Sequence, residues 1–290
     1  MNTLFTYFSF DKDGQPYYRL TNELNEVTTH YIKFGTDLTL EFDTSQRFCT
    51  GGSDLGTYDS WPCPDRAKVD TKYSQCRRCM GKTGFNPAFY YSDTISDQQA
   101  EYNQQPHGLY LAYFDDDNLK IGMSHNRRGL SRLLEQGARA AIVLGEFATA
   151  NVARQYEAKL VRLPWLNESL TLSKKIDILS SFDYSAQHAA DQLRAAVQRI
   201  ATETSLSFEL SGVDNLNRFY GDTTDLQDLN DMSGQAIISG KVRACVGSLL
   251  VANNDDNKLL LPLKKFVGYR VTVSNVVKNV ELAPKQFTLF

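Results

Sequence analysis

The segment HGLYLAYFDDDNLKIGMS, residues 107–124, holds two apolar stretches separated by a run of acidic residues. Aromatic and aliphatic side chains dominate residues 107–114 and 119–124, as is typical of strands. The polar residues 115–118 between them favour a tight turn. The segment therefore predicts an antiparallel hairpin, and this hairpin sets the frame for the part of the chain that follows it.

A helix, a strand and a second helix are predicted directly after the hairpin. The first helix covers 130–136 and ends at Gly137, a residue type that is common just past a helix C-terminus. Residues 140–144 are expected to form a buried strand, and Thr149 can cap the second helix. The apolar residues of that helix recur at helical spacing and a proline follows them: Val152, Tyr156, Leu160, Leu163 and Pro164. Residues 107–165 are therefore expected to form one small α/β unit.

The rest of the chain divides into segments of different composition, and together they predict an α+β protein. The expected parts are an N-terminal β segment at 1–46, a cysteine module at 47–90, a polar linker at 91–106, the core at 107–165, a helical connector at 172–205 and a C-terminal β domain at 206–290. We expect the C-terminal strands to form a small β-barrel or sandwich, which the N-terminal strands are candidates to complete.

The composition of the chain excludes several classes of protein. The chain has 290 residues, a net charge of -3, 42% hydrophobic residues and 22% charged residues, which are globular proportions and exclude a disordered polycation. Its longest apolar runs fall far short of the roughly 20 residues that span a bilayer, so we expect no membrane segment. The N-terminus lacks the basic and apolar regions of a secretory signal, so a cytoplasmic location is expected.

Cysteines carry the sharpest chemical signal in the sequence. Cys49, Cys63, Cys76 and Cys79 fall within one stretch rich in glycine and proline, and the last two form a C-x-x-C knuckle. Zn²⁺ takes four thiolates in a tetrahedron, and one tight turn can aim both knuckle sulfurs at one ion. We therefore predict a structural zinc site on these residues, with a redox pair and unliganded thiols as the alternatives. Cys245 lies in an apolar, strand-like run and is expected to be a buried thiol.

Short motifs in the α/β unit resemble the core of the GIY-YIG nucleases. They are Gly108-Leu109-Tyr110 on the first strand, Lys120-Ile121-Gly122 on the second strand and Arg132-Leu133 on the following helix. A glutamate on the later helix completes the pattern, in the spacing A-x-x-x-E-x-x-L formed by Ala153, Glu157 and Leu160. The resemblance implies a small mixed sheet flanked by helices.

This resemblance also implies roles for individual residues. In such nucleases the tyrosine of the first motif helps to activate the nucleophile, the arginine binds phosphate and the glutamate holds Mg²⁺. By position these residues are Tyr110, Arg132 and Glu157. Lys120 stands where the second motif has a tyrosine, and a lysine can bind phosphate as a point charge or act as a base if burial lowers its pKa. Whether the core cleaves its ligand or only binds it is open at this point.

The cysteine module and the core together are similar to an uncharacterised bacterial and archaeal family. Its members carry a cysteine-rich segment before a core of this kind. The similarity rests on the ordered set QCRRC, LYLA, KIG and RLLEQGA, which begin at Gln75, Leu109, Lys120 and Arg132. It covers roughly residues 40–165 and implies that a zinc segment and a nuclease-like fold occur side by side.

Basic residues are concentrated in two stretches, although the chain as a whole is slightly acidic. Arg66, Lys68, Lys72, Arg77, Arg78 and Lys82 lie in the cysteine module, and Lys120, Arg127, Arg128, Arg132 and Arg139 lie in the core. Such segregation can give one basic face for a phosphate backbone, with Arg77, Arg78, Arg127 and Arg128 as the candidate contacts. Tyr73 and Phe85 can stack on bases. The alternative is an ordinary solvated cationic face.

These signals predict a cytoplasmic zinc protein that binds DNA or RNA through a GIY-YIG-like core. The core would be a Mg²⁺-dependent endonuclease if Tyr110, Lys120, Arg132 and Glu157 are catalytic. Two alternatives stay open. The same core and zinc segment can form a binding module without catalysis, or the C-terminal β domain can make the chain a protein-interaction scaffold.

Overall fold

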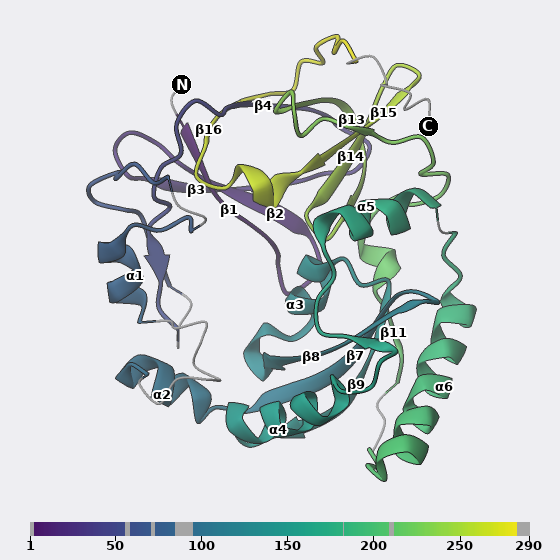
Figure 1. Cartoon of the computed structure of the whole chain (residues 1–290). Helices are drawn as coiled ribbons and strands as arrows, with labels where there is room; N and C mark the ends of the chain where they lie inside the picture. The colour runs from purple at the N-terminus through teal and green to yellow at the C-terminus, as the bar shows by residue number, and fades with distance from the viewer. Residues whose placement is uncertain are drawn as a thin grey trace, which may run out of the picture.

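Two β-sheets and the helix between them define the architecture. The computed structural model describes residues 3–55, 59–70, 73–84, 95–181, 183–208 and 212–282. The larger sheet lies above the smaller one in Figure 1, and helix α3 (Gly129–Gln136) lies between them. Helix α6 (Ala186–Thr204) runs along one side of the smaller sheet. No helix in the described part of the chain combines the length and the apolar character that a bilayer crossing needs.

The larger sheet has nine strands and is built from both ends of the chain. Its order is β12 (Asn230–Asp231), β15 (Asn257–Pro262), β14 (Leu249–Asn254), β13 (Ile237–Val246), β4 (Asp37–Asp43), β16 (Arg270–Ser274), β1 (Thr3–Phe10), β2 (Pro16–Thr21) and β3 (Val27–Tyr31). Neighbouring strands run antiparallel except for the short β12–β15 pair, which is parallel. The N-terminal strands thus share one sheet with the C-terminal strands.

Of the two forms expected for the β domain, a barrel or a sandwich, the closed barrel is wrong, whereas the mixed α+β class is confirmed. Across the described residues the larger sheet stays open, with β12 and β3 at its two edges. The reason lies in how the two ends of the chain interleave. Strand β4 sits between β13 and β16, and β16 then pairs with β1, so β2 and β3 extend the sheet outward and do not return to β12.

The smaller sheet contains the predicted hairpin. Its order is β10 (Leu166–Asn167), β8 (Asn118–His125), β7 (His107–Asp115), β9 (Ala140–Phe147) and β11 (Asp214–Asn215). Strand β7 is central and pairs antiparallel with β8 and β9. Its residues Leu109, Leu111 and Tyr113 pack in a core with α6, while Tyr110 and Ala112 belong to the core shared with the larger sheet. Burial of both faces explains why β7 is a continuous apolar run without polar alternation.

Helix α3 joins the two sheets. It contacts β1 and β13 of the larger sheet and β8 of the smaller sheet. It ends at Gly137, which is left-handed with a φ of 80°, as its sequence position predicts.

The other helical segments are α1 (Arg77–Thr83), α2 (Asp97–Asn103), α4 (Ala150–Leu160), α5 (Leu172–Ser181), η1 (Asn126–Arg128), η2 (Leu216–Phe219) and η3 (Leu263–Phe266). In the cysteine module, β5 (Gly52–Ser53) pairs with β6 (Ser60–Trp61). Thr149 caps α4 by accepting a hydrogen bond from the Val152 amide at 3.4 Å.

Candidate functional site

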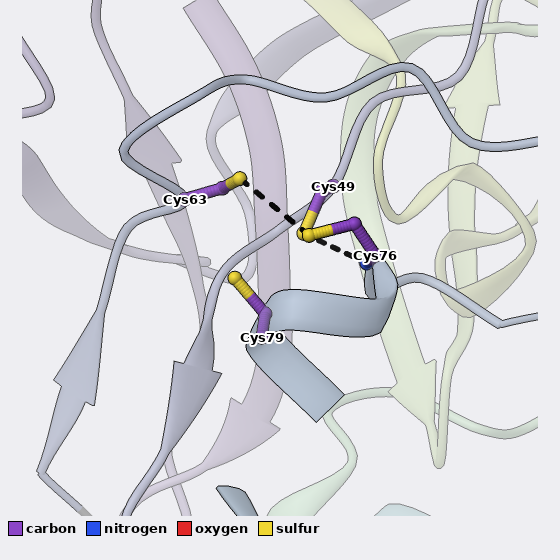
Figure 2. Close-up of side chains that lie close together, drawn as sticks. All are labelled: Cys49, Cys63, Cys76 and Cys79. Carbon is purple, nitrogen blue, oxygen red and sulfur yellow. Dashed lines mark hydrogen bonds between the residues drawn. The ribbon is translucent and has the colours of Figure 1, made fainter. Parts of the chain in front are cut away.

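Four cysteine sulfurs meet in the cysteine module. The Sγ atoms of Cys49, Cys63, Cys76 and Cys79 all lie within 4.8 Å of one another, and none of the four forms a disulfide. Figure 2 shows them turned toward a common centre, two from the start of α1 and two from separate loops. The sulfurs of Cys63 and Cys76 are 4.0 Å apart. This is close to the ~3.8 Å edge of a tetrahedron whose thiolates lie about 2.3 Å from zinc.

Local backbone geometry presents these sulfurs to one another. Cys76 is the N-cap of α1, so the knuckle turns directly into the helix that carries Cys79. The amides of Cys76 and Gly51 donate to Cys49 Sγ at 3.1 and 3.4 Å, and such bonds strengthen when the sulfur is a thiolate. Gly51 has a φ of +85°, and a Cβ there would lie 1.9 Å from the Trp61 carbonyl oxygen, so this loop requires glycine.

Burial opposes negative charge on these sulfurs unless a cation compensates it. Desolvation raises the pKa of Cys49 to about 11 and also raises the pKa of Cys79, whereas a hydrogen bond from the Cys79 amide lowers the pKa of Cys76. A bound divalent cation converts such thiols to thiolates and neutralises them. The four residues can therefore hold a metal ion such as zinc, in line with the prediction.

The fifth cysteine, Cys245, does not belong to this cluster. Among the residues that the structure describes, the cluster is the one group of three or more His, Cys, Asp or Glu side chains with metal-binding geometry. Cys245 lies fully buried in β13 and outside the group, as predicted. Burial strongly raises the pKa of the Cys245 thiol, so this residue behaves as a small apolar core side chain.

A second group of residues lies where β7, β8, α3 and α4 meet. Tyr110 is only 4% exposed, and it faces Gly122, its partner across the hairpin. A Cβ on Gly122 would lie 2.6 Å from the Tyr110 hydroxyl oxygen, so the ring covers the glycine directly. Gln136 of α3 donates to the same oxygen at 2.5 Å. The hairpin register and α3 together fix the position of the phenol.

Lys120, Arg132 and Glu157 share the surroundings of this phenol. Burial is the main cause that raises the pKa of Tyr110; Arg132 lowers that pKa and Glu157 raises it. Burial likewise lowers the pKa of Lys120, while Glu157 raises it and Arg132 lowers it further. Charges influence one another in this way only at short range, because solvent and salt screen them beyond roughly 10 Å. The structure thus brings the four predicted catalytic residues into one electrostatic neighbourhood.

Glu157 is buried on α4 and already has a cationic partner. Arg154 Nη1 lies 2.5 Å from Glu157 Oε2 and 3.5 Å from Glu168 Oε1. Lys120 Nζ donates to the backbone carbonyl of Glu168, in the loop after β10. Arg154 and Glu168 were not predicted. Arg154 was visible one turn before Glu157 on the same helix, whereas Glu168 reaches the site through the parallel pairing of β10 with β8, for which the sequence has no signal.

Lys175 of α5 adds a further cation that sequence reasoning missed. Its Nζ donates to the Gln136 carbonyl at 2.7 Å, so it lies against the same turn of α3 as the phenol's hydrogen-bond donor. Burial lowers the pKa of Lys175 to about 8, and three neighbouring cations contribute in the same direction: Lys264, Lys120 and Arg132. This end of α3 therefore carries an excess of positive charge.

Stability should depend on the protonation of Lys175 in a defined direction. The folded-state pKa of about 8 lies below the ordinary value of 10.5, so between these pH values the unfolded chain binds more protons than the folded one. We compare the free energy of unfolding of the wild type with that of Lys175→Met. The wild-type value minus the variant value should rise by on the order of 2–3 kcal/mol between pH 8 and pH 10.5. Below pH 8 this difference should stay constant. Urea unfolding of both proteins across both pH ranges measures the difference; a flat difference would contradict the assigned burial.

Gly122→Ala should lower stability because the added Cβ collides with the Tyr110 ring. We expect a loss of about 1–3 kcal/mol in the free energy of unfolding, as for other overpacked cores. The matched control is Gly81→Ala, at an exposed position of α1 where a Cβ meets nothing within 4 Å and helix propensity favours alanine. Denaturant unfolding compares the two variants. Equal stabilities would show that the ring does not lie over Gly122.

The arginines predicted to contact nucleic acid lie on two different elements. Arg77 and Arg78 are exposed on α1, and Arg78 Nη1 lies 2.9 Å from Asp65 Oδ2. Arg127 and Arg128 belong to η1, where Arg128 Nη2 lies 2.8 Å from Glu135 Oε2. The η1 pair lies directly before α3, so it adjoins the helix that carries Arg132 and Gln136.

Other members of the predicted basic face are placed differently. Arg139 is buried and donates to Asn217 Oδ1 at 2.7 Å, so it contributes to the core and not to an exposed face. Tyr73 is exposed. Lys72 and Phe85 lie outside the residues that the structure describes.

Comparison with known proteins places the chain in a family. No curated protein matches it, and no solved structure matches it. Residues 35–271 match the family described as "Protein of unknown function (DUF2797)". This range takes in the four cysteines and the whole core, so the two sites described above belong to one family unit. The chain is therefore a member of the DUF2797 family, an uncharacterised family as the sequence led us to expect.

Proposed function

We propose that this protein binds nucleic acid and hydrolyses its phosphodiester bonds at the GIY-YIG-like core, with zinc as a structural ion. One observation carries the proposal. Arg132 and Glu157 act electrostatically on both Tyr110 and Lys120, so the four side chains lie in one neighbourhood. They occupy the positions to which the resemblance assigns the chemistry. A phenol, two cations and a carboxylate in one place suit phosphoryl chemistry.

Zinc is the ion that best fits the cysteine cluster. Four thiolates in a tetrahedron favour zinc over harder cations. A fully cysteine-ligated ion has no open position for substrate, so its role is structural. Among its described residues, the module has a small core in which Cys49, Cys63 and Cys79 pack with Val69. The ion would supply the stability that this core lacks.

The charges at the core favour a phosphate ligand. Lys120 lies within electrostatic reach of Glu157 and Arg132, and Lys175 lies within reach of Lys120 and Arg132. Arg154 contacts both Glu157 and Glu168. The cations therefore outnumber the carboxylates. Lys120 would hold a phosphate oxygen as a point charge, while the planar guanidinium of Arg132 can donate two hydrogen bonds to it. Donors fixed in this way stabilise the charge that develops on the phosphoryl oxygens.

Hydrolysis adds one water molecule across the phosphodiester. The water oxygen bonds to phosphorus, the bond from phosphorus to one sugar oxygen breaks, and a water proton ends on the released hydroxyl. Because burial raises the pKa of Tyr110, the phenol is neutral at neutral pH and would orient the attacking water by a hydrogen bond. A bound divalent cation would supply charge neutralisation and a more acidic water. Lys120 and Arg132 would hold the phosphate in line for attack.

The carboxylates present are compatible with Mg²⁺. This ion needs only one or two protein carboxylates, because it keeps several waters and borrows phosphate oxygens. Glu157 and Glu168 both lie close to the same atom, Nη1 of Arg154. Glu157 would hold the ion, and Glu168 is the nearby carboxylate that could act as a second ligand. The cation must compete with Arg154 for Glu157 Oε2.

The same ion pair favours a second candidate function, which is binding of nucleic acid without cleavage. A carboxylate held at 2.5 Å by a guanidinium is a weaker metal ligand than an unpaired one. In that case Lys120, Arg132 and Lys175 would bind the phosphate backbone, and Glu157 would only orient Arg154. The two functions share the same contacts to phosphate and differ in whether the core takes up a divalent cation.

One assay separates these functions. The wild-type protein is incubated at low salt with labelled DNA and RNA, single-stranded and duplex, in Mg²⁺, in Ca²⁺ or without added divalent cation. Chelators are avoided because they would also remove zinc. Binding with Mg²⁺-dependent cleavage supports the proposal, and binding without cleavage supports the second candidate. Absence of both would overturn the nucleic-acid function and favour a protein-interaction scaffold.

A further inference from the structure

A cavity of about 380 Å³ opens between the larger sheet, the cysteine module and the start of α3. Its volume lies near the lower end of the roughly 300–1,000 Å³ found for sites that hold small organic groups. Three parts of the chain that are distant in sequence form its walls, and the side chains that matter for its chemistry are Tyr7, Tyr17, Arg19, Trp61, Arg128 and Glu135. The chemistry proposed for the core does not use this cavity.

One wall is aromatic and cationic at once. The ring centroids of Tyr7 and Tyr17 are 6.1 Å apart, and Arg19 Cζ lies 5.5 Å from the first centroid and 5.7 Å from the second. Arg19 Nη1 also donates to Ser60 Oγ at 2.8 Å, which ties β2 to the cysteine module. Flat π surfaces and a guanidinium plane are the groups on which unpaired bases stack.

The part of the lining that comes from η1 and α3 favours an anion. Arg127 and Arg128 line it together with Glu135, the one carboxylate among the described lining residues. Ser9 Oγ donates to Glu135 Oε1 at 2.5 Å, while Arg128 and Lys264 lie 2.8 and 3.4 Å from Oε2. The carboxylate is thus held by two cations and a hydroxyl. Although burial alone would raise the pKa of Glu135, Lys264 and Arg128 hold it below its ordinary value, and the wall keeps a net positive charge.

Helix α3 connects this cavity to the core site. Ser131 and Glu135 line the cavity, while the neighbouring residues Arg132 and Gln136 serve the phenol at the core. Lys264 lies within electrostatic reach of both Arg128 and Arg132. A continuous series of cations therefore runs from the cavity to the core site. A strand with one phosphate at Arg132 could place a neighbouring nucleotide in the cavity.

We propose that this cavity binds one unpaired base of a single-stranded nucleic acid, stacked at Tyr17 and Arg19, with the adjoining phosphate at Arg127 and Arg128. The inference rests on the proposed function and specifies its substrate class. A base inside a duplex is covered by its neighbours and cannot enter a cavity without unpairing and unstacking. A single strand offers its bases at no such cost, so the protein should prefer it.

Fluorescence anisotropy with labelled oligonucleotides tests this directly. Single-stranded DNA, single-stranded RNA and the corresponding duplexes are compared at one fixed salt concentration, since affinity depends steeply on salt, and without Mg²⁺. Wild type should bind at least one of the single strands more tightly than its duplex. Tyr17→Ala should weaken binding of that strand by about tenfold, the loss expected for one stacked base, and should leave duplex binding unchanged.

Two further variants keep the result interpretable. Tyr17→Phe retains the ring and should keep the wild-type affinity. Tyr31→Ala removes the next tyrosine, whose ring is 6.0 Å from that of Tyr17 but which does not line the cavity, and it should have no effect. Equal affinity for single strand and duplex, or no loss in Tyr17→Ala, would overturn the inference while leaving the proposed function intact. Absence of binding to any of the nucleic acids would overturn both.

Discussion

Glu157→Gln is expected to reduce the single-turnover rate of phosphodiester cleavage by at least about 10³-fold. The amide keeps the size of the side chain but loses the charge that would hold a divalent cation, and such a cation stabilises the transition state by several kcal/mol. Binding of the oligonucleotide should persist, because Lys120 and Arg132 are unchanged and Arg154 gains freedom to contact phosphate. Rates and affinities are measured on the same preparation, with thermal unfolding to confirm the fold.

The matched control is Glu203→Gln on α6. Glu203 is also paired with an arginine on its own helix, with Arg199 Nε at 2.6 Å from its carboxylate, yet it is not among the charges that act on Tyr110 or Lys120. This variant should cleave like the wild type. If Glu157→Gln cleaved at the wild-type rate, the catalytic site would lie elsewhere. If both glutamines impaired cleavage equally, the loss would reflect stability and not chemistry.

Cys79→Ser is expected to reduce bound zinc from about one ion per chain to nearly none and to unfold the cysteine module. Serine is a poor ligand for zinc, and the remaining three sulfurs no longer close the tetrahedron. Zinc contributes about 10–16 kcal/mol of apparent binding energy in small zinc-ligated peptides, which equals or exceeds the stability of a typical domain. Elemental analysis measures the metal, and limited proteolysis detects the unfolded module.

Cys245→Ala controls for the loss of a buried sulfur. This thiol is fully buried in β13 and lies outside the cluster, so its removal should lower stability modestly and leave zinc content unchanged. A Cys79→Ser protein that kept stoichiometric zinc, or purified wild type without any metal, would contradict the structural role assigned to the cluster. Acidification should release zinc from the wild type, because protonation of the thiolates competes with the metal.

Local signals allowed much of the fold to be predicted. The β7–β8 hairpin follows from two apolar stretches around an acidic turn, and the end of α3 and the start of α4 follow from Gly137 and Thr149. The N-terminal strands were correctly expected to be candidates to complete the C-terminal β structure, but the order of the strands could not be predicted in this way. The position of β4 between β13 and β16 depends on contacts between residues far apart in sequence, and the expected barrel was wrong for that reason.

In the two sites, too, the parts that depend on local sequence were predictable and the parts that depend on tertiary packing were not. The cysteine cluster was predictable because a C-x-x-C knuckle aims two thiolates at one point, and a metal can gather the other two from loops. Glu168 and Lys175 could not be assigned to the core site, since their positions depend on how β10 and α5 pack. Tyr17 and Arg19 had no functional signal either, because their meeting with the cysteine module and α3 is a consequence of the tertiary fold.

A crystal structure of Glu157→Gln bound to an oligonucleotide would show whether the phosphodiester lies at the core. We expect one phosphate within hydrogen-bond distance of both Lys120 Nζ and the Arg132 guanidinium, with the Tyr110 hydroxyl beside it. If the oligonucleotide bound on another face of the protein, with these three side chains out of contact, the core would not be the site of cleavage.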